Sequence, residues 1–395
     1  MDALTTPLPK NWQRVRLGDI AEINPPTIIP NIFYYIDLES VEKGQLLNKQ
    51  LMTKNKAPSR ARRLLSKNDI LYQLVRPYQR NNYFFSLNGN YVASTGYAQI
   101  RTLQNPSFLY FALHSNYFVN AVLDRCEGTS YPAISSNELK KCEVILPPLN
   151  EQIAIANVLS DVDRYLYSLD ALILKKESVK KALSFELLSQ RKRLKGFNQN
   201  WQRVRLGTYK YRRGSFPQPY GNPQWYSDNG MPFVQVYDVG ENFKLTQKTK
   251  QKISKIAQPM SVFVPKNSVI ITLQGTIGRV ALTQYDCYCD RTILIFDNNT
   301  LNDVNKYFFV LSLFTKFEEE KRKADGSIIK TITKQTLKDF EILLPPLNEQ
   351  IAIANVLSGL DNEIISLKNK KRQFENVKKA LNHDLMSAKI RVLKE

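Results

Sequence analysis

LPPLNEQIAIANVLS occupies residues 146–160, and the same fifteen residues recur at 344–358. An identical repeat of this length indicates that the chain is built from two copies of one unit. The prolines at 147–148 end any preceding strand, because proline cannot donate a hydrogen bond to a strand ladder. Asn150 is a favourable helix N-cap, and Glu151 places a negative charge in the first turn. The stretch therefore predicts that the same helix begins at two places in the chain.

Each predicted helix is long and carries a regular apolar stripe. The first extends to about Lys195, where a basic run and the following Gly196 fit a helix C-terminus. About 40 residues at a rise of 1.5 Å per residue make a helix about 60 Å long. The heptad spacing predicts that the two helices pack against each other as a coiled coil. The alternative is a pair of long core helices inside one globule.

The expected contact residues of this coiled coil occupy two heptad positions. They are Ile155, Val162, Leu169, Leu172, Val179 and Leu183 in the first helix, and Ile353, Leu360, Leu367, Phe374 and Leu381 in the second. Apolar residues at a neighbouring heptad position widen the stripe of the first helix, namely Leu159, Leu166, Ile173 and Leu187.

A second repeat extends the duplication to the rest of the chain. NWQRVRLG occurs at 11–18 and again at 200–207, whereas the segments between the repeats differ in sequence and length. We therefore divide the chain into a first globule (1–148), a first long helix (149–196), a second globule (197–346) and a second long helix (347–395).

The globules mix strand-like and helical segments. Strands are predicted from β-branched and aromatic runs bounded by Asn, Gly and Pro, at 34–41, 69–75, 82–87, 91–102, 231–239, 268–275 and 291–296. Helical patterns cover 106–123 and 303–321, and the capping-box pattern from Ser135 to Glu138 predicts a short helix. The predicted fold class is therefore α+β (mixed α/β), with two globular domains and two long helices.

The composition favours a partner that is a polyanion. The chain of 395 residues has 56 Lys and Arg against 36 Asp and Glu, a net charge of +20. Such an excess predicts attraction to nucleic acid and a steep dependence of binding on salt. Short apolar runs, the absence of a signal-peptide pattern and four cysteines without metal-type spacing predict a reduced cytoplasmic protein without a metal site.

The sequence predicts no catalytic residue and no cofactor site. NPPT at 24–27 resembles the Asn-Pro-Pro-aromatic motif of amino-methyltransferases, but the aromatic residue that would stack on a flipped base is missing. No Gly-rich loop between a strand and a helix precedes it. His114 lies in an apolar helical stretch and is predicted to pack in a core.

Basic, amide and aromatic residues gather in loops at matching places in the two globules. Arg and the amides Asn and Gln are the side chains that recognise guanine and adenine edges. For any single residue the alternative is an ordinary solvated loop. The predicted DNA-binding residues are Arg76, Tyr78, Arg80, Asn81, Thr129 and Tyr131 in the first globule, and Arg212, Arg213, Gln218, Gln274, Thr276, Arg279, Ser327 and Lys330 in the second.

Over essentially its whole length the chain resembles the specificity subunit of a Type I restriction-modification system. The resemblance rests on the Leu-Pro-Pro-Leu-x-Glu-Gln helix starts at 146 and 344 and the Trp-x-x-Val-x-Leu-Gly motifs at 12 and 201. The loops at 128–130 and 326–327, each followed by a short helix and a Pro-Pro turn, also fit.

The resemblance implies a non-catalytic subunit that reads a bipartite, asymmetric target in double-stranded DNA. The globules would be target recognition domains, and the helices an antiparallel spacer that docks two methyltransferase (M) subunits. Restriction (R) subunits could join, and S-adenosylmethionine, ATP and Mg would bind only to these partners. Two alternatives remain at this stage, a basic coiled-coil scaffold for nucleic acid and a self-contained DNA methyltransferase or nuclease. The missing catalytic motifs argue against the enzyme.

Overall fold

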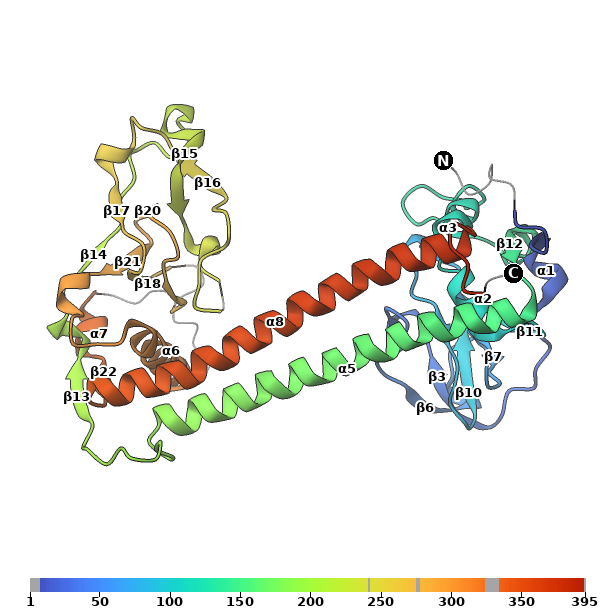
Figure 1. Ribbon diagram of the computed structural model, residues 1–395, viewed down its shortest axis with the longest axis horizontal. Helices are drawn as coiled ribbons and strands as arrows, with labels where there is room; N and C mark the ends of the chain where they lie inside the picture. Colours follow the sequence, from blue (N-terminus) through green and yellow to red (C-terminus); the bar gives the residue numbers. More distant parts are fainter. Residues whose placement is uncertain (1–7, 241, 275–277, 324–333, 394–395) are drawn as a thin grey trace. The chain divides into compact units, whose positions relative to one another are not determined.

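The computed structural model describes residues 8–240, 242–274, 278–323 and 334–393. The chain forms two compact units, one of Met1–Leu172 with Leu367–Glu395 and the other of Ile173–Ser366. Each unit contains one globule and part of both long helices (Figure 1). The boundaries of the four segments predicted from the sequence therefore stay predictions, because the compact units cut across the helices. None of the described helices is long and apolar enough to span a membrane.

The first globule is built on two four-stranded sheets and a two-stranded ribbon. The ribbon joins β1 (Gln13–Arg16) to β12 (Glu143–Leu146). One sheet has the order β2 (Ala21–Ile23), β11 (Tyr97–Thr102), β8 (Ile70–Gln73), β9 (Tyr83–Phe84). The other has the order β6 (Gln50–Thr53), β3 (Ile32–Ile36), β10 (Tyr91–Ser94), β7 (Ala61–Leu64), and a short hairpin joins β4 (Val41–Glu42) to β5 (Gln45–Leu46). The helices are α1 (Leu17–Ile20), α2 (Pro106–Ala112), α3 (Asn116–Leu123) and α4 (Ser136–Lys141), with 3-10 turns η1 (Leu38–Ser40), η2 (Lys54–Lys56) and η3 (Pro77–Gln79).

The second globule repeats this topology. Its ribbon joins β13 (Gln202–Arg205) to β22 (Glu341–Leu344). Its sheets have the orders β14 (Tyr211–Arg213), β21 (Ile293–Phe296), β18 (Val269–Thr272), β19 (Val280–Leu282) and β16 (Gln251–Ile253), β15 (Tyr226–Val234), β20 (Cys287–Cys289), β17 (Val262–Val264). The helices are α6 (Lys306–Lys323) and α7 (Lys334–Asp339), with 3-10 turns η4 (Leu206–Thr208), η5 (Pro223–Trp225), η6 (Val236–Asp238), η7 (Gln258–Met260) and η8 (Asn298–Thr300). In each globule one strand pair is parallel, β3 with β10 and β15 with β20. The shared scaffold confirms the predicted mixture of strands and helices.

The long helices are α5 (Leu149–Leu188) and α8 (Leu347–Met386), each of 40 residues. Ion pairs show that they run antiparallel within each unit, because the partners advance along one helix and retreat along the other. The pairs are Asp163–Lys378 and Asp170–Lys371 in the first unit, and Lys176–Glu363 and Lys180–Asp361 in the second. The predicted helix pairing is confirmed, and it is antiparallel as the resemblance implied.

The contact line between the helices differs from the predicted one at two positions. Leu172 and Val179 are 38% and 44% exposed, so they are not buried between the two helices as predicted. The buried residues of α5 lie instead in two rows. One row contains Ile155 and Leu169, and the other lies four residues further along and contains Leu159, Leu166 and Ile173. At 100° per residue, Ile173 lies about 40° around the helix from the row of Leu169, and Leu172 lies about 60° from that row in the opposite direction. Both rows are apolar, so composition did not distinguish them.

The ends of α5 also differ from the prediction. Asn150 is not the N-cap, because α5 begins at Leu149 and the amides of Glu151 and Gln152 donate to the carbonyl of Pro148. At its other end α5 stops at Leu188 rather than near Lys195. Leu188 is buried in the core of the second unit, and the chain then turns towards β13 through the left-handed residue Gln190.

The duplicated sequence motifs meet in one buried polar site per unit. Glu151, at the start of α5, accepts hydrogen bonds from Trp12 Nε1 at 3.0 Å and from two guanidinium nitrogens of Arg391, each at 3.0 Å. Glu349, at the start of α8, accepts from Trp201 Nε1 at 3.2 Å and from Arg193 Nε at 3.0 Å. In each unit, the arginine follows the end of the other long helix. We call these two sites the Trp–Glu–Arg clamps.

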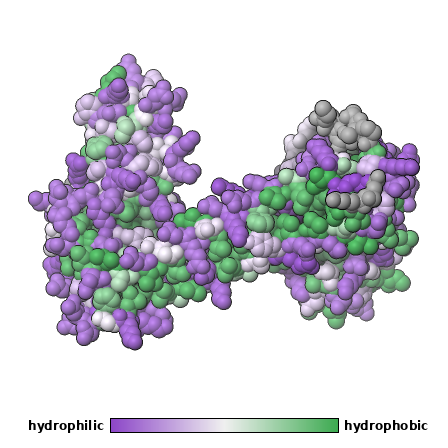
Figure 2. Space-filling model, viewed as in Figure 1, coloured by the Kyte–Doolittle hydropathy of each residue, from purple (hydrophilic) through white to green (hydrophobic). Residues whose placement is uncertain are grey.

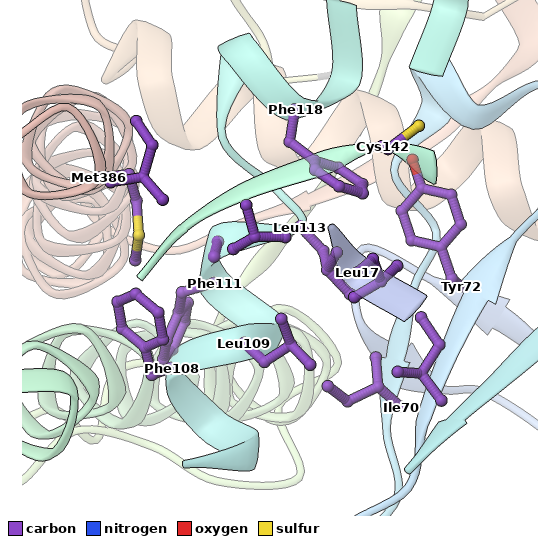
Figure 3. Close-up of a cluster of buried hydrophobic side chains, with 14 of the residues drawn as sticks. Leu17, Ile70, Tyr72, Phe108, Leu109, Phe111, Leu113, Phe118, Cys142 and Met386 are labelled. Atoms are coloured by element: carbon purple, nitrogen blue, oxygen red, sulfur yellow. The ribbon is translucent and has the colours of Figure 1, made fainter. Parts of the chain in front are cut away.

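The globule cores enclose the ends of the long helices. In the first unit Met386 of α8 lies in the same apolar cluster as Phe108, Leu17 and Tyr72 (Figure 3). In the second unit, Leu188 of α5 packs in the corresponding cluster. Helix and globule therefore share one core, and the clamp charges lie beside it.

Candidate nucleic-acid interface

The loop between β8 and β9 carries four of the predicted DNA-binding residues and is held by buried amides. Asn82 Oδ1 accepts from the Gln73 amide at 2.8 Å, and Gln73 Oε1 accepts from the Asn81 amide at 3.1 Å. Arg76 and Arg80 adopt left-handed backbone conformations with φ of 55° and 54°. Because Gln73 and Asn82 are buried and fully engaged here, the protein itself fixes the loop shape.

This loop meets the loop that follows Gly128. The Arg76 amide donates to the carbonyl of Pro132 at 2.7 Å, and the Arg76 guanidinium lies 4.2 Å from the ring centroid of Tyr131. Tyr131 is 63% exposed, and Tyr78 and Thr129 are also exposed. The structure thus brings two predicted loops together at an arginine stacked on a tyrosine, a favourable cation–π arrangement.

Arg80 and Asn81 are engaged inside the protein. Arg80 donates to the carbonyl of His114 at 2.9 Å and to Asn116 Oδ1 at 2.8 Å, and burial lowers the pKa of its guanidinium. Asn81 Oδ1 accepts from the Lys43 amide at 3.1 Å. His114 Nδ1 lies 2.7 Å from the Tyr110 carbonyl, and burial lowers the pKa of this histidine to about 4. His114 therefore packs in the globule as a neutral ring, as predicted.

The predicted residues of the second globule lie at several places. Gln274 is exposed in the loop between β18 and β19, which corresponds to the β8–β9 loop. Arg279 in the same loop donates to the Val239 carbonyl at 3.1 Å. Arg212 on β14 donates to the Phe263 carbonyl at 3.1 Å. Arg213 and Gln218 are exposed nearby in the chain, and Thr276, Ser327 and Lys330 lie outside the described residues.

A second arginine–tyrosine stack, which the sequence analysis missed, lies at the corresponding sheet end. The Arg291 guanidinium is 5.2 Å from the ring centroid of Tyr220. The Leu273 amide donates to the Thr292 carbonyl at 2.8 Å, so the residues before β21 lie beside the start of the Gln274 loop. In the first globule Leu74 donates to Gly96 in the same way, at 2.9 Å. The sequence pattern predicted Arg291 to be the first residue of a strand. The pairing of distant strands, which brings Arg291 to this sheet end, could not be predicted from the sequence.

Each globule also carries a basic segment without acidic residues, which the sequence analysis missed. Residues 43–67 contain eight Lys or Arg and no Asp or Glu, and residues 244–266 contain six Lys and no Asp or Glu. The segments occupy equivalent places, since each spans the two edge strands of its sheet and the turn that links them. Most of these cations are exposed. A window count of charges of opposite sign would have found both segments.

One lysine of each segment contacts aromatic rings. Lys49 Nζ lies 4.5 Å from the Tyr34 ring centroid, and Lys250 Nζ lies 5.0 Å from that of Tyr237. The hydrogen bond to Tyr91 raises the pKa of Lys49. Both lysines precede a glutamine that begins an edge strand, so the scaffold equivalence extends to single side chains.

Comparisons with known proteins agree with this architecture. The family model described as "Type I restriction modification DNA specificity domain" matches residues 9–177 and 218–376. "Putative type I restriction enzyme MjaX specificity subunit" of Methanocaldococcus jannaschii is 29% identical over 271 residues, covering 66% of this chain and 62% of that protein. The type I restriction enzyme MjaVIII specificity subunit of the same organism is 23% identical and covers 98% of this chain and 94% of that protein.

Two solved structures share the fold. The S subunit of a Type I restriction-modification system from M. genitalium superimposes with a TM-score of 0.63 at 15% identity, covering 96% of this chain and 98% of that one. The HsdS subunit from Thermoanaerobacter tengcongensis has a TM-score of 0.51 at 23% identity, with coverage of 98% and 99%.

Proposed function

The chain belongs to the Type I restriction modification DNA specificity domain family, and from this premise we propose that it reads a split DNA target for a Type I system. The observation that carries the proposal is the pair of globules with one strand order and different loop side chains. Arg76 and Tyr78 stand where the second globule presents Gln274. Different donors and acceptors select different bases, so the two half-sites are unlike and lie a fixed distance apart. The basic segments supply contacts to phosphate.

Exchange of one globule tests this proposal. The full chain is assembled with the methyltransferase subunits of its own system, and the methylated motif is mapped by sequencing. Replacement of residues 197–346 by the same region of a relative is expected to change one half-site and to leave the other half-site unchanged. A continuous motif, or a change in both halves, would contradict the proposal.

We propose that catalysis belongs to partner subunits. The sequence has no nucleotide-binding loop and no catalytic motif that would hold S-adenosylmethionine or ATP with Mg, so these cofactors are assigned to methyltransferase and restriction subunits. The purified chain with S-adenosylmethionine is expected to leave its target DNA unmethylated, and addition of the methyltransferase subunits is expected to give methylation. Methylation by the chain alone would overturn this division of labour.

The start of each long helix offers a docking face for a methyltransferase subunit. Leu149 and Ile153 are exposed on α5, and the identical residues Leu347 and Ile351 are exposed on α8, one pair in each unit. Apolar side chains are visible on the surface along the helices (Figure 2). Two identical faces support two copies of one partner. Ile153→Glu is expected to leave one methyltransferase bound per chain and the double change with Ile351→Glu to leave none, as measured by light scattering of the complex.

A further inference from the structure

We propose that Arg76 stacked on Tyr131 and Arg291 stacked on Tyr220 each read a guanine, one in each half-site. The inference rests on the proposed function and names the reading side chains and the base. The two stacks lie at the same end of equivalent sheets in the two globules. In the first globule β8 ends there beside the turn that leads into β11, and in the second β18 ends beside the turn that leads into β21. Arg76 lies in the loop after β8 and Arg291 in the turn before β21, so the two stacks occupy the same end of two equivalent sheets but come from different loops.

Both guanidinium groups keep their donors available. Across the residues that the structure describes, neither Arg76 nor Arg291 has a carboxylate or a hydrogen-bond acceptor for its guanidinium. Arg101 and Arg80 of the first globule differ, since Arg101 pairs with Asp69 at 2.9 Å and Arg80 donates to two acceptors. Arg191 also stacks on a ring, that of Phe185, but it lies just after the end of α5, whereas Arg76 and Arg291 each stack on a tyrosine at the end of a globule sheet.

The carboxylate next to Arg291 is occupied by other groups. Asp290 is buried, and its Oδ1 accepts from the Thr292 amide at 2.8 Å and from the Thr292 hydroxyl at 2.6 Å. Its Oδ2 accepts from the Tyr220 hydroxyl. Asp290 thus fixes both the turn that carries Arg291 and the ring on which Arg291 stacks. In the first globule the hydrogen bond from the Arg76 amide to the Pro132 carbonyl joins the Arg76 loop to the residue that follows Tyr131.

The stacked geometry suits a base edge. A ring beneath the guanidinium holds its plane and leaves two parallel N–H donors at its rim, which match O6 and N7 of guanine. Lysine is a point charge and cannot reproduce this fork. Phosphate could accept the same two hydrogen bonds, but each globule already has a separate basic segment for phosphate. The neighbours Tyr78, Thr129 and Gln274 are uncharged polar side chains, which suits contact with bases.

Substitution by lysine tests the inference because it keeps the charge. Full-length variants are assembled with their methyltransferase subunits and bound to duplex libraries randomised in one half-site at a time. Arg76→Lys is expected to reduce the preference for guanine at one position of one half-site by about 10- to 100-fold. Arg291→Lys is expected to do the same at one position of the other half-site only. Arg101→Lys is the matched control, because its guanidinium is held by Asp69.

The outcomes separate this inference from the proposed function. Equal weakening on all sequences by Arg76→Lys and Arg291→Lys would identify phosphate contacts and overturn the inference. A wild-type complex that prefers a split target, with variants that keep every base preference, would also overturn it and leave the proposed function intact. A wild-type complex without a split preference would overturn both. Thermal unfolding of each variant shows whether a loss comes from unfolding, and Tyr131→Ala and Tyr220→Ala give a second pair of variants expected to relax the same two positions.

Discussion

At the scale of single residues, the Trp–Glu–Arg clamps explain why the duplicated motifs keep a glutamate and a tryptophan. Glu151 is buried, and it is the acceptor for both Trp12 and Arg391. Its replacement by Ala leaves the Arg391 charge without this partner in a partly buried site. We expect Glu151→Ala to lower the free energy of unfolding by about 2–4 kcal/mol, measured by urea titration. Asp161→Ala on the exposed face of α5 is the control, expected to change it by less than about 0.5 kcal/mol; equal effects would contradict the clamp.

His114 makes the stability of the first globule dependent on pH. Burial holds its pKa at about 4 in the folded state, below the usual value of 6.5. At pH 7 both states are neutral and no stability is lost, whereas below pH 6.5 the unfolded state takes up the proton first. Stability should therefore fall by about 1.6 kcal/mol between pH 6.5 and pH 5 from this residue alone. Urea titrations at these two pH values are expected to show a smaller fall for His114→Gln, and an equal fall would exclude His114 as the cause.

At the scale of elements, the observed contact between the long helices predicts that two adjacent residues of α5 respond differently to substitution by a charged residue. Ile173 is buried and Leu172 is 38% exposed, although both are large and apolar. Ile173→Asp places a charge against α8 and is expected to cost about 3–5 kcal/mol, whereas Leu172→Asp faces solvent and is expected to cost less than about 1 kcal/mol. Urea titration of both variants measures the difference. The reverse order would restore the contact line first predicted.

The sequence predicted the elements better than the contacts between them. Strands, the α2–α3 region, the short helix after Ser135 and both long helices follow from local patterns, and the structure has them. The choice between Leu172 and Ile173 depends on how the helix is rotated against its partner, which apolar character alone does not encode. The Arg291–Tyr220 stack depends on strand pairing far apart in sequence, so no local signal identified it.

At the scale of the whole molecule, the duplication extends from sequence motifs to individual interactions. Lys180–Asp361 in one unit corresponds to Lys378–Asp163 in the other under the same 198-residue offset that relates the two helix starts. This ion pair is therefore duplicated, whereas Lys176–Glu363, Asp170–Lys371 and the loops that carry Arg76 and Arg291 are not. In the two clamps the glutamates and the arginines are also 198 residues apart, whereas Trp12 and Trp201 are 189 residues apart. A duplicated frame that carries different loops agrees with the proposal of two unlike half-sites.

Much of the net charge of +20 lies in the two basic segments without acidic residues, 43–67 and 244–266. This placement predicts how binding to DNA depends on salt. Each lysine that neutralises a phosphate contributes about 0.9 to the slope of log K against log salt. Lys54→Gln with Lys56→Gln should lower the slope by about 1.8 and weaken all sequences alike, because phosphate contacts carry no base information. Lys175→Gln with Lys181→Gln removes the same charge from α5, outside the segments, and is expected to leave the slope nearly unchanged. Binding titrations of the assembled complex between 50 and 200 mM salt compare the two pairs, and equal slopes would show that net charge, rather than the placement of the segments, governs attraction to DNA.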